Sequence, residues 1–325
     1  MTRPLLLFIF MSNSDNVILV GAITQPYRAG RMEGLAAGGL GVLAFSFSLP
    51  ATRLAEGGGL DLVVVGFGRA IVAGVLALGL LAMTRQKRPQ GTDWLRIAVV
   101  AAGVVFGFPF FSALALEHLS AAHGAVIVGL LPAATAVAAV VRAGERPPLP
   151  FWLASGAGLV AVLAFAAFSG AGLPQPADLL VLVAVALCAF GYAEGGALAR
   201  RLGGWQVICW ALVMSLPVLV PLMAVHFWRS GMPQASATGW GGFLYLSFVS
   251  MFLGFFAWYR GLARGGVARI GQVQLAQPVL TLLWSALLLG ERVSGGMVLA
   301  AMAVLVCVLL TQRTRAPFRA GKGGG

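Results

Sequence analysis

The sequence predicts an all-α membrane protein whose ten transmembrane helices form two inverted five-helix repeats. Composition is the first of three observations behind this prediction. Of 325 residues, 59% are hydrophobic and 10% are charged, and the mean hydropathy is +0.92, whereas a soluble domain carries about 25% charged residues. The basic residues lie in short gaps between apolar runs, which favours a membrane protein over a nucleic-acid-binding one.

A motif that occurs twice is the second observation. Pro132-Ala-Ala-Thr135 precedes Gly144-Glu145-Arg146, and Pro278-Val-Leu-Thr281 precedes Gly290-Glu291-Arg292. Both parts recur after 146 residues (278 − 132 and 290 − 144). An apolar pattern that repeats in two halves is typical of many secondary transporters.

The third observation is the distribution of basic residues. With the N-terminus inside, the inside segments hold 18 of the 22 Lys and Arg residues, the outside segments hold 3, and Arg69 lies within a span. Because Lys and Arg accumulate in cytoplasmic loops, this bias predicts a multi-pass protein of the cell inner membrane with both termini cytoplasmic. Five helices per half is an odd number, so the second half enters the membrane from the opposite side and the repeats are inverted.

The ten predicted spans are runs of mostly apolar residues near the length of about 20 residues that a bilayer requires. In chain order they are Leu35–Leu54, Leu62–Met83, Trp94–Leu116, Ala122–Val141, Phe151–Phe168, Leu179–Leu198, Val207–Trp228, Trp240–Tyr259, Val267–Leu289 and Gly296–Thr311.

Four segments follow from these spans. Residues 1–34 are expected to be disordered or extended, because Ser12–Asn16 interrupts their apolar run, and Met32 is an alternative start. The first repeat covers residues 35–169 and the second covers residues 178–312. Residues 313–325 form a basic cytoplasmic tail.

The chain resembles the EamA-type members of the drug/metabolite transporter superfamily. The likeness rests on the duplicated motif, together with Phe47-Ser48-Leu49-Pro50, Arg69 and Ala199-Arg200-Arg201-Leu202. It extends from residue 35 to about residue 312. The resemblance implies ten helices, a central cavity and the export of small metabolites, but it implies no particular substrate.

Glu194 is the leading candidate for chemistry, since a charged side chain at the centre of a bilayer costs roughly 2.5–3.5 kcal/mol on insertion scales. Tyr192 precedes it, and Gly195 and Gly196 would leave room for a ligand or water. One hypothesis makes Glu194 a proton-coupling or amine-binding carboxylate. The other makes it one half of a structural ion pair, for which Arg69 is the expected partner.

Other candidates for the cavity lie on the helices that carry the motif. Gln274, Gln277 and Thr281 follow helical spacing on one face, and their amide and hydroxyl groups suit either solute binding or interhelical hydrogen bonds. Aromatic walls are expected from Phe110, Phe256 and Trp258, the first two of which correspond at the repeat offset (256 − 110 = 146). Helix kinks are expected at Pro50, Pro132 and Pro278, because proline removes a backbone donor.

These observations predict a secondary transporter that exports small metabolites, amino acids or drug-like amphipathic solutes by alternating access through a central cavity. An intramembrane enzyme and a passive channel are the alternatives, but the sequence has neither HExxH, nor a nucleophile elbow, nor a repeated filter-like loop. The expected partners are a small solute, protons as a coupling ion and the lipid bilayer, and a monomer is compatible with the sequence. No nucleic acid, cofactor or metal is expected; the three cysteines stand isolated in apolar runs: Cys188, Cys209 and Cys307.

Overall fold

The computed structural model describes residues 24–116, 118, 127–168, 176–289 and 295–313, and every element assigned in these ranges is helical. The elements in chain order are α1 (Thr24–Ser46), α2 (Ser48–Gly57), η1 (Val64–Gly68), α3 (Arg69–Met83), α4 (Asp93–Val100), η2 (Ala101–Gly107), α5 (Phe108–Leu116), α7 (Leu131–Ala143), α8 (Leu149–Phe168), α9 (Asp178–Leu202), α10 (Gly204–Ser230), α11 (Ala237–Leu244), η3 (Tyr245–Gly254), α12 (Phe255–Gly265), α13 (Val267–Gly271), η4 (Gln272–Ala276), α14 (Gln277–Leu289) and α15 (Gly295–Arg313).

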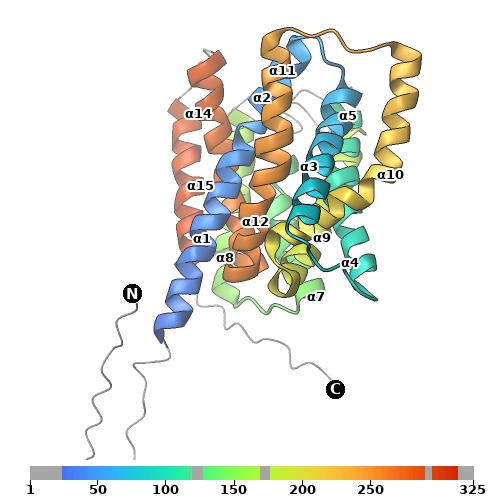
Figure 1. The fold of residues 1–325 in the computed structure, drawn as a ribbon. Helices are drawn as coiled ribbons and strands as arrows, with labels where there is room; N and C mark the ends of the chain where they lie inside the picture. The colour runs from blue at the N-terminus through green and yellow to red at the C-terminus, as the bar shows by residue number, and fades with distance from the viewer. Residues whose placement is uncertain (1–23, 117, 119–126, 169–175, 290–294, 314–325) are drawn as a thin grey trace, which may run out of the picture.

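The helices form a bundle of alternating direction (Figure 1). Six continuous helical segments among the described residues are long and apolar enough to cross a membrane: Met32–Gly57, Val64–Met83, Asp93–Ser112, Asp178–Leu202, Gly204–Ser230 and Ala237–Gly265. Two shorter apolar helices cover Leu131–Arg142 and Leu149–Ala161. The chain is therefore a multi-pass helical membrane protein, with six of the ten predicted spans long enough in the described residues. The first helix begins at Thr24, 11 residues before the predicted start at Leu35 (35 − 24).

Helix α9 lies in the centre of the bundle and packs on α4, α5, α7, α10 and α12. Its glycines permit this close packing. A Cβ on Gly195 would lie 2.2 Å from the Tyr259 ring, and a Cβ on Gly196 would lie 2.8 Å from the Val267 side chain. The space beside Glu194 that the sequence suggested for a ligand or water is therefore filled by side chains of α12 and α13.

Three segments within the spans are π-helical: η1, η2 and η3. Residues 101–107 of η2 correspond, after the 146-residue offset, to residues 247–253 (101 + 146 and 107 + 146), which lie inside η3. A π-helical turn widens the helix locally and often accompanies a functional site. The two halves therefore share this irregularity at equivalent positions.

The prolines that were expected to kink helices each lie in the first turn of an assigned helix, and the kinks themselves stay a prediction. Pro50 is the third residue of α2, Pro132 is the second residue of α7, and Pro278 is the second residue of α14, although its side chain lies outside the described residues. Proline is tolerated in a first turn because the N–H it lacks would have no partner there. Each proline thus follows a break between helices, where the chain changes direction.

The break between α1 and α2 has a specific hydrogen-bond partner. Pro50 cannot donate to the carbonyl of Ser46, four residues earlier. The Thr281 hydroxyl of α14 donates to that carbonyl at 2.8 Å, and Trp284 Nε1 donates to Ser46 Oγ at 2.9 Å. The carbonyl freed by Pro50 is therefore satisfied from the other half of the chain, as a buried polar group requires.

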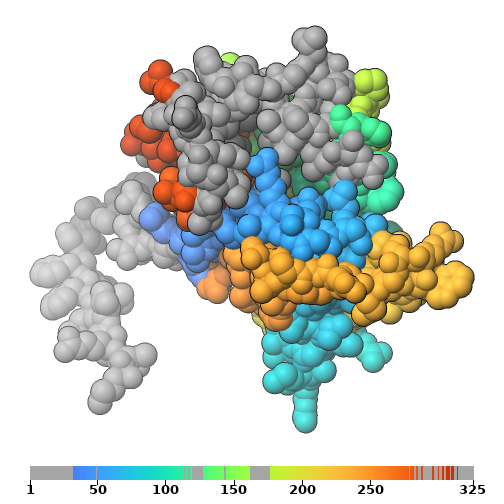
Figure 2. Space-filling view, turned by 90° about the horizontal axis from the view of Figure 1, so that it is seen from above, coloured from blue at the N-terminus to red at the C-terminus, as the bar shows by residue number. Residues whose placement is uncertain are grey.

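The two ends of the bundle differ in character. The upper end in Figure 1, defined by Gly57, Leu60 and Gly231, carries the contact between α2 and α11. Figure 2 views this end and shows α2 in blue beside the gold segment that leads into α11. There Ser236 N–H donates to the Gly58 carbonyl at 2.8 Å. The lower end, defined by Glu33, Asp93 and Glu145, carries most of the ion pairs described below.

Candidate functional site

A buried cluster of polar and aromatic side chains lies between α9, α12 and η4. Tyr192 is 5% exposed, and its hydroxyl accepts a hydrogen bond from Gln274 Nε2 at 3.3 Å. The Tyr192 ring lies 5.2 Å from the Trp258 ring, measured between centroids. The structure therefore brings together three of the residues proposed from the sequence: Tyr192 of α9, Trp258 of α12 and Gln274 of η4.

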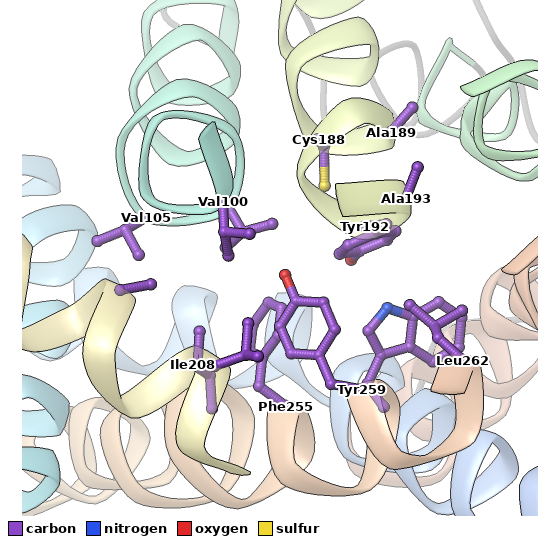
Figure 3. Packing of buried hydrophobic residues seen from close by; sticks show 14 of the residues in the cluster. Val100, Val105, Cys188, Ala189, Tyr192, Ala193, Ile208, Phe255, Tyr259 and Leu262 are labelled. Carbon is purple, nitrogen blue, oxygen red and sulfur yellow. The ribbon is translucent and has the colours of Figure 1, made fainter. Parts of the chain in front are cut away.

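Figure 3 shows this region from close by, with Tyr192 of α9 facing Phe255 and Tyr259 of α12. Tyr259 donates its hydroxyl to the Gly191 carbonyl at 3.2 Å, which ties α12 to α9. Phe255 and Tyr192 lie 6.3 Å apart between ring centroids. These aromatic contacts hold the two helices in register around the cluster.

Three polar atoms in and around this cluster have no hydrogen-bond partner among the described residues. They are Trp258 Nε1, Gln274 Oε1 and the hydroxyl oxygen of Thr135. Their residues are 0%, 6% and 0% exposed, respectively. The methyl group of Thr135 packs on Gly271. A buried polar atom without a partner costs about 1–3 kcal/mol. One donor and one acceptor of the cluster, Trp258 Nε1 and Gln274 Oε1, and the nearby α7 hydroxyl of Thr135 thus form no hydrogen bond with the described residues.

Gln272 is a buried residue that the sequence analysis did not single out, and it differs from Gln274 in its hydrogen bonds. Its Nε2 donates to the Pro132 carbonyl at 3.0 Å, and its Oε1 accepts from Ser155 Oγ at 3.0 Å. Both ends of the amide are satisfied, so that Gln272 joins η4 to α7 and α8. Residues two positions apart point to different sides of a helix, and Gln272 and Gln274 of η4 accordingly contact different partners.

Glu194 forms its ion pairs with two arginines other than Arg69. Its Oε1 accepts from Arg96 of α4, and its Oε2 lies 2.7 Å from Arg142 Nη2 and 2.9 Å from Arg142 Nε of α7. The carboxylate is 1% exposed, whereas the two guanidinium groups are 32% and 44% exposed. Glu194 therefore ties α4, α7 and α9 together close to the lower end.

Further ion pairs and hydrogen bonds join helices at the lower end. The Glu145 carboxylate accepts from the backbone N–H groups of Val267 at 2.7 Å and Ala268 at 2.8 Å, and it pairs with Arg200 at 2.8 Å. Two more pairs join Asp93 to Arg201, and Glu33 to Arg260 and Arg264. We call these contacts, with those of Glu194, the lower-end ion network. The basic residues in it were counted from the sequence only as topology signals.

The other proposed site residues lie apart from the Tyr192 cluster. Gln277 is partly buried at the start of α14, and Thr281 binds the Ser46 carbonyl as described above. Phe110 is 47% exposed and stacks on Phe67, whereas Phe256 contacts Phe252 and Trp205. Arg69 is partly buried, and its Nε is fully buried without a hydrogen-bond partner in the described part of the chain.

Two grooves on the bundle, of about 410 and 430 Å³, are lined almost wholly by apolar side chains. One lies between α7, α8 and α9 and includes Trp152 and Ser155; the other lies between α1, η3 and α14 and includes Tyr245 and Trp284. Neither groove is lined by a residue of the Tyr192 cluster. The cluster is therefore closed to both of these surfaces in this conformation.

Comparison with known proteins relates the whole chain to membrane transporters. Residues 32–167 and 175–313 each match the EamA-like transporter family. The "Uncharacterized transporter YdeK" of Bacillus subtilis (strain 168) is 47% identical over 276 residues, which cover 85% of this chain and 96% of that protein. A crystal structure with 18% sequence identity superposes with a TM-score of 0.71 over 87% of this chain and 99% of its own, and this likeness concerns the fold alone. The chain belongs to the EamA-like transporter family.

Proposed function

We propose that this protein is a secondary transporter that exports small metabolites, amino acids or amphipathic solutes by alternating access. The observation that carries the proposal is the Tyr192 cluster, in which two buried polar atoms, Trp258 Nε1 and Gln274 Oε1, have no hydrogen-bond partner among the described residues. A solute that forms hydrogen bonds to them would offset the free energy lost on their burial. Trp258 and Tyr192 would provide an apolar wall for the rest of the solute.

Alternating access requires that only one end of the path is open at a time. The lower-end ion network supports a closed lower end, because it joins α1, α4, α7, α9, α12 and α13 by charged contacts. The charge bias of the sequence supports a cytoplasmic position for this end. Opening it would require Glu194 to leave Arg96 and Arg142, and Glu145 to leave the start of α13.

The ten-span inverted topology belongs to the same proposal. Two matches to one family model along the chain and the π-helical segments at equivalent positions support two related halves, residues 35–169 and 178–312. The odd number of spans in each half would place the halves in opposite orientation. Residues 313–325 would then be a cytoplasmic tail.

Glu194 fits the ion-pairing hypothesis better than the proton-coupling one. Two guanidinium groups contact its two oxygens, so that the carboxylate is fully engaged in contacts between helices. We therefore assign Glu194 to the closure of the lower end, with Arg96 and Arg142 in place of Arg69. A proton gradient, if it drives export, would act through another group.

Transport by the purified protein in proteoliposomes tests the proposal. The vesicles are loaded with a mixture of radiolabelled amino acids and amphipathic aromatic solutes, and solute loss is measured with and without a pH gradient. Trp258→Phe keeps an aromatic ring but removes the Nε1 donor, so the loss of the transported solute should slow at least about tenfold, as expected for a lost buried hydrogen bond. Phe256→Leu, outside the cluster, is the matched control. Solute loss no faster than from protein-free vesicles would contradict the proposal.

A further inference from the structure

Arg69 is a cation within a membrane-spanning helix that has no anionic partner in the described structure. It is the first residue of α3 and lies five residues after Val64, where the span begins (69 − 64). Five residues of helix correspond to about 7 Å of depth. Its Nε is fully buried without a hydrogen-bond partner, and no charged group of the described residues acts on it. A charged side chain within a membrane span is costly and normally has a partner.

No carboxylate of the described residues pairs with Arg69. Glu33, Asp93, Glu145 and Glu194 belong to the lower-end ion network, and Asp61 pairs with His226 at 3.0 Å. Asp178 has another contact, and Glu56, partly buried on α2, forms no ion pair with Arg69 in this conformation. Glu194, the partner expected from the sequence, already has two guanidinium groups. The Arg69 charge is therefore not neutralised by a contact with any of the described carboxylates.

A purely structural role explains this arrangement poorly. Structural arginines within spans pair with a carboxylate or with backbone carbonyls, or they extend to the interface where water solvates the whole guanidinium group. Arg69 has no such bond in the described structure, and its Nε is sealed from solvent. The adjoining segment η1 is π-helical, an irregularity that is frequent at functional sites.

We propose that Arg69 recognises the anionic group of the transported solute, and that the solute is a small organic anion bearing a carboxylate or a phosphate. The planar guanidinium presents its donors in a fork that matches both groups bidentately. In the solute-free conformation this fork lacks an anion, and the solute would supply it. This inference rests on the proposed function, because it names the chemical class that the transporter moves.

The position of Arg69 assigns its step in transport. It lies five residues from the upper end of its span, whereas the closed ion network lies at the lower end. Tyr192 is 14 residues from the start of α9 and 10 residues from its end (192 − 178 and 202 − 192), near mid-helix. A solute that contacts the Tyr192 cluster would therefore meet Arg69 on the upper half of its path.

Paired solutes that differ only in charge test the anion requirement. The full-length protein in detergent is titrated with phenylacetate or phenylacetamide, with hexanoate or hexanamide, and with phenyl phosphate, and the melting temperature is recorded. At least one of the anions should raise the melting temperature saturably, and its amide should not. Equal stabilisation by acid and amide would overturn the proposal, as would the absence of stabilisation by any of the anions.

Three variants connect this binding to Arg69. Arg69→Gln should raise the dissociation constant of the bound anion at least tenfold, and Arg69→Lys should retain part of the affinity because it keeps the charge but not the fork. Arg229→Gln, an exposed arginine at the upper end, should bind as the wild type does. Unchanged affinity in Arg69→Gln would overturn the proposal.

The melting temperature of the variants without solute distinguishes a role of Arg69 in solute recognition from a role in stabilising the fold. Removal of an unpaired buried cation should leave the melting temperature of Arg69→Gln unchanged or higher. A lower melting temperature that Glu117→Gln restores in the double variant would instead identify a partner within the chain, since Glu117 lies outside the described residues, and would overturn the proposal. In proteoliposomes, an anion that binds but does not cross would contradict the proposed transport and leave the anion site standing. Movement of the amides in preference to the acids would contradict only the anion class.

Discussion

At the scale of single residues, the paired charges decide how this bundle is held together. Glu194 is almost completely buried, yet both of its oxygens contact guanidinium groups from other helices. Removing one partner of a buried pair is strongly destabilising, because the remaining charges lose their compensation. The arginines are partly exposed, so that water would compensate part of this loss.

Glu194→Gln should therefore lower the free energy of unfolding by about 1–3 kcal/mol, below the usual cost of breaking a fully buried pair. The matched control is Glu33→Gln, whose carboxylate is 36% exposed and also pairs with two arginines. Solvent screens an exposed pair, which contributes little to stability, so this control should change the melting temperature little. Melting of the purified proteins checks the difference, and equal losses in both variants would contradict the assignment of Glu194.

Asp61, at the upper end, is expected to make the stability of the fold depend on pH. Burial alone would raise the pKa of its carboxyl, but hydrogen bonds from the Val64 N–H, from His226 and from the Val63 N–H outweigh burial and lower this pKa. A lowered pKa in the folded state stabilises the fold above the unfolded pKa of about 3.9. This stabilisation is lost as the pH falls through the folded pKa.

Asp61→Asn keeps an acceptor for the backbone N–H groups but removes the titrating carboxyl. Below about pH 4 the wild-type advantage over this variant should shrink, and at neutral pH it should amount to less than about 1 kcal/mol, because the carboxylate is 48% exposed and screened by solvent. Melting temperatures of both proteins between neutral pH and pH 3 measure this. A difference that stays constant over the whole range would refute the role of the Asp61 charge.

At the scale of secondary-structure elements, the start of α13 is held by a side chain from a distant loop. Gly266 has φ of 88°, a conformation that favours glycine, and it lets the chain turn into α13. The first two N–H groups of α13 point at the Glu145 carboxylate. An acidic group at a helix N-terminus is favourable both as a cap and through the helix dipole.

Glu145→Gln should weaken this cap, because an amide has only one oxygen and no charge. Hydrogen exchange of the Val267 and Ala268 amides should become about tenfold faster, which corresponds to roughly 1.4 kcal/mol, within the range for a lost helix cap. Mass spectrometry of the peptide that spans α13 measures the exchange, with Arg146→Gln as the control. Unchanged protection in Glu145→Gln would show that other contacts hold the start of α13.

The sequence predicted the elements better than their irregularities. Long apolar runs identified the helices around α3, α9 and α10, because burial in lipid demands length and hydrophobicity. The π-helical segments and the 3₁₀ turn of η4 were not predictable, since they arise from packing between distant helices rather than from local composition. The different directions of the Gln272 and Gln274 side chains follow from their spacing of two residues, but the partners that each one contacts arise from tertiary packing.

The site residues were also predictable only in part. The expense of a charge within a span identified Glu194 and Arg69 as unusual. The aromatic and amide residues Tyr192, Gln274 and Trp258 lie together, and their lining of a central cavity stays a prediction. The partners of Glu194 were not predictable, because Arg96 and Arg142 lie at helix ends where basic residues also set topology. Pairing across three helices is a property of the tertiary fold.

At the scale of the whole molecule, charge is distributed unequally between the two ends of the bundle. In the described structure, the lower end holds Glu33, Asp93, Glu145 and Glu194 with their arginines, while the upper end holds the Asp61–His226 pair. This asymmetry suits a membrane transporter of the EamA-like family that is closed at its basic end. The central claim is that two related halves face the membrane in opposite orientations around one solute path.

Labelling of single cysteines tests this claim most directly. The native Cys188, Cys209 and Cys307 are buried, so that their background reaction with a membrane-impermeant maleimide should be low. Arg146→Cys and Arg292→Cys place one thiol in each copy of the Gly-Glu-Arg motif. In intact cells the reagent should label Arg292→Cys, and it should label Arg146→Cys only after the membrane is permeabilised. Labelling of both positions from the same side of the membrane would contradict the inverted repeat and the alternating-access account built on it.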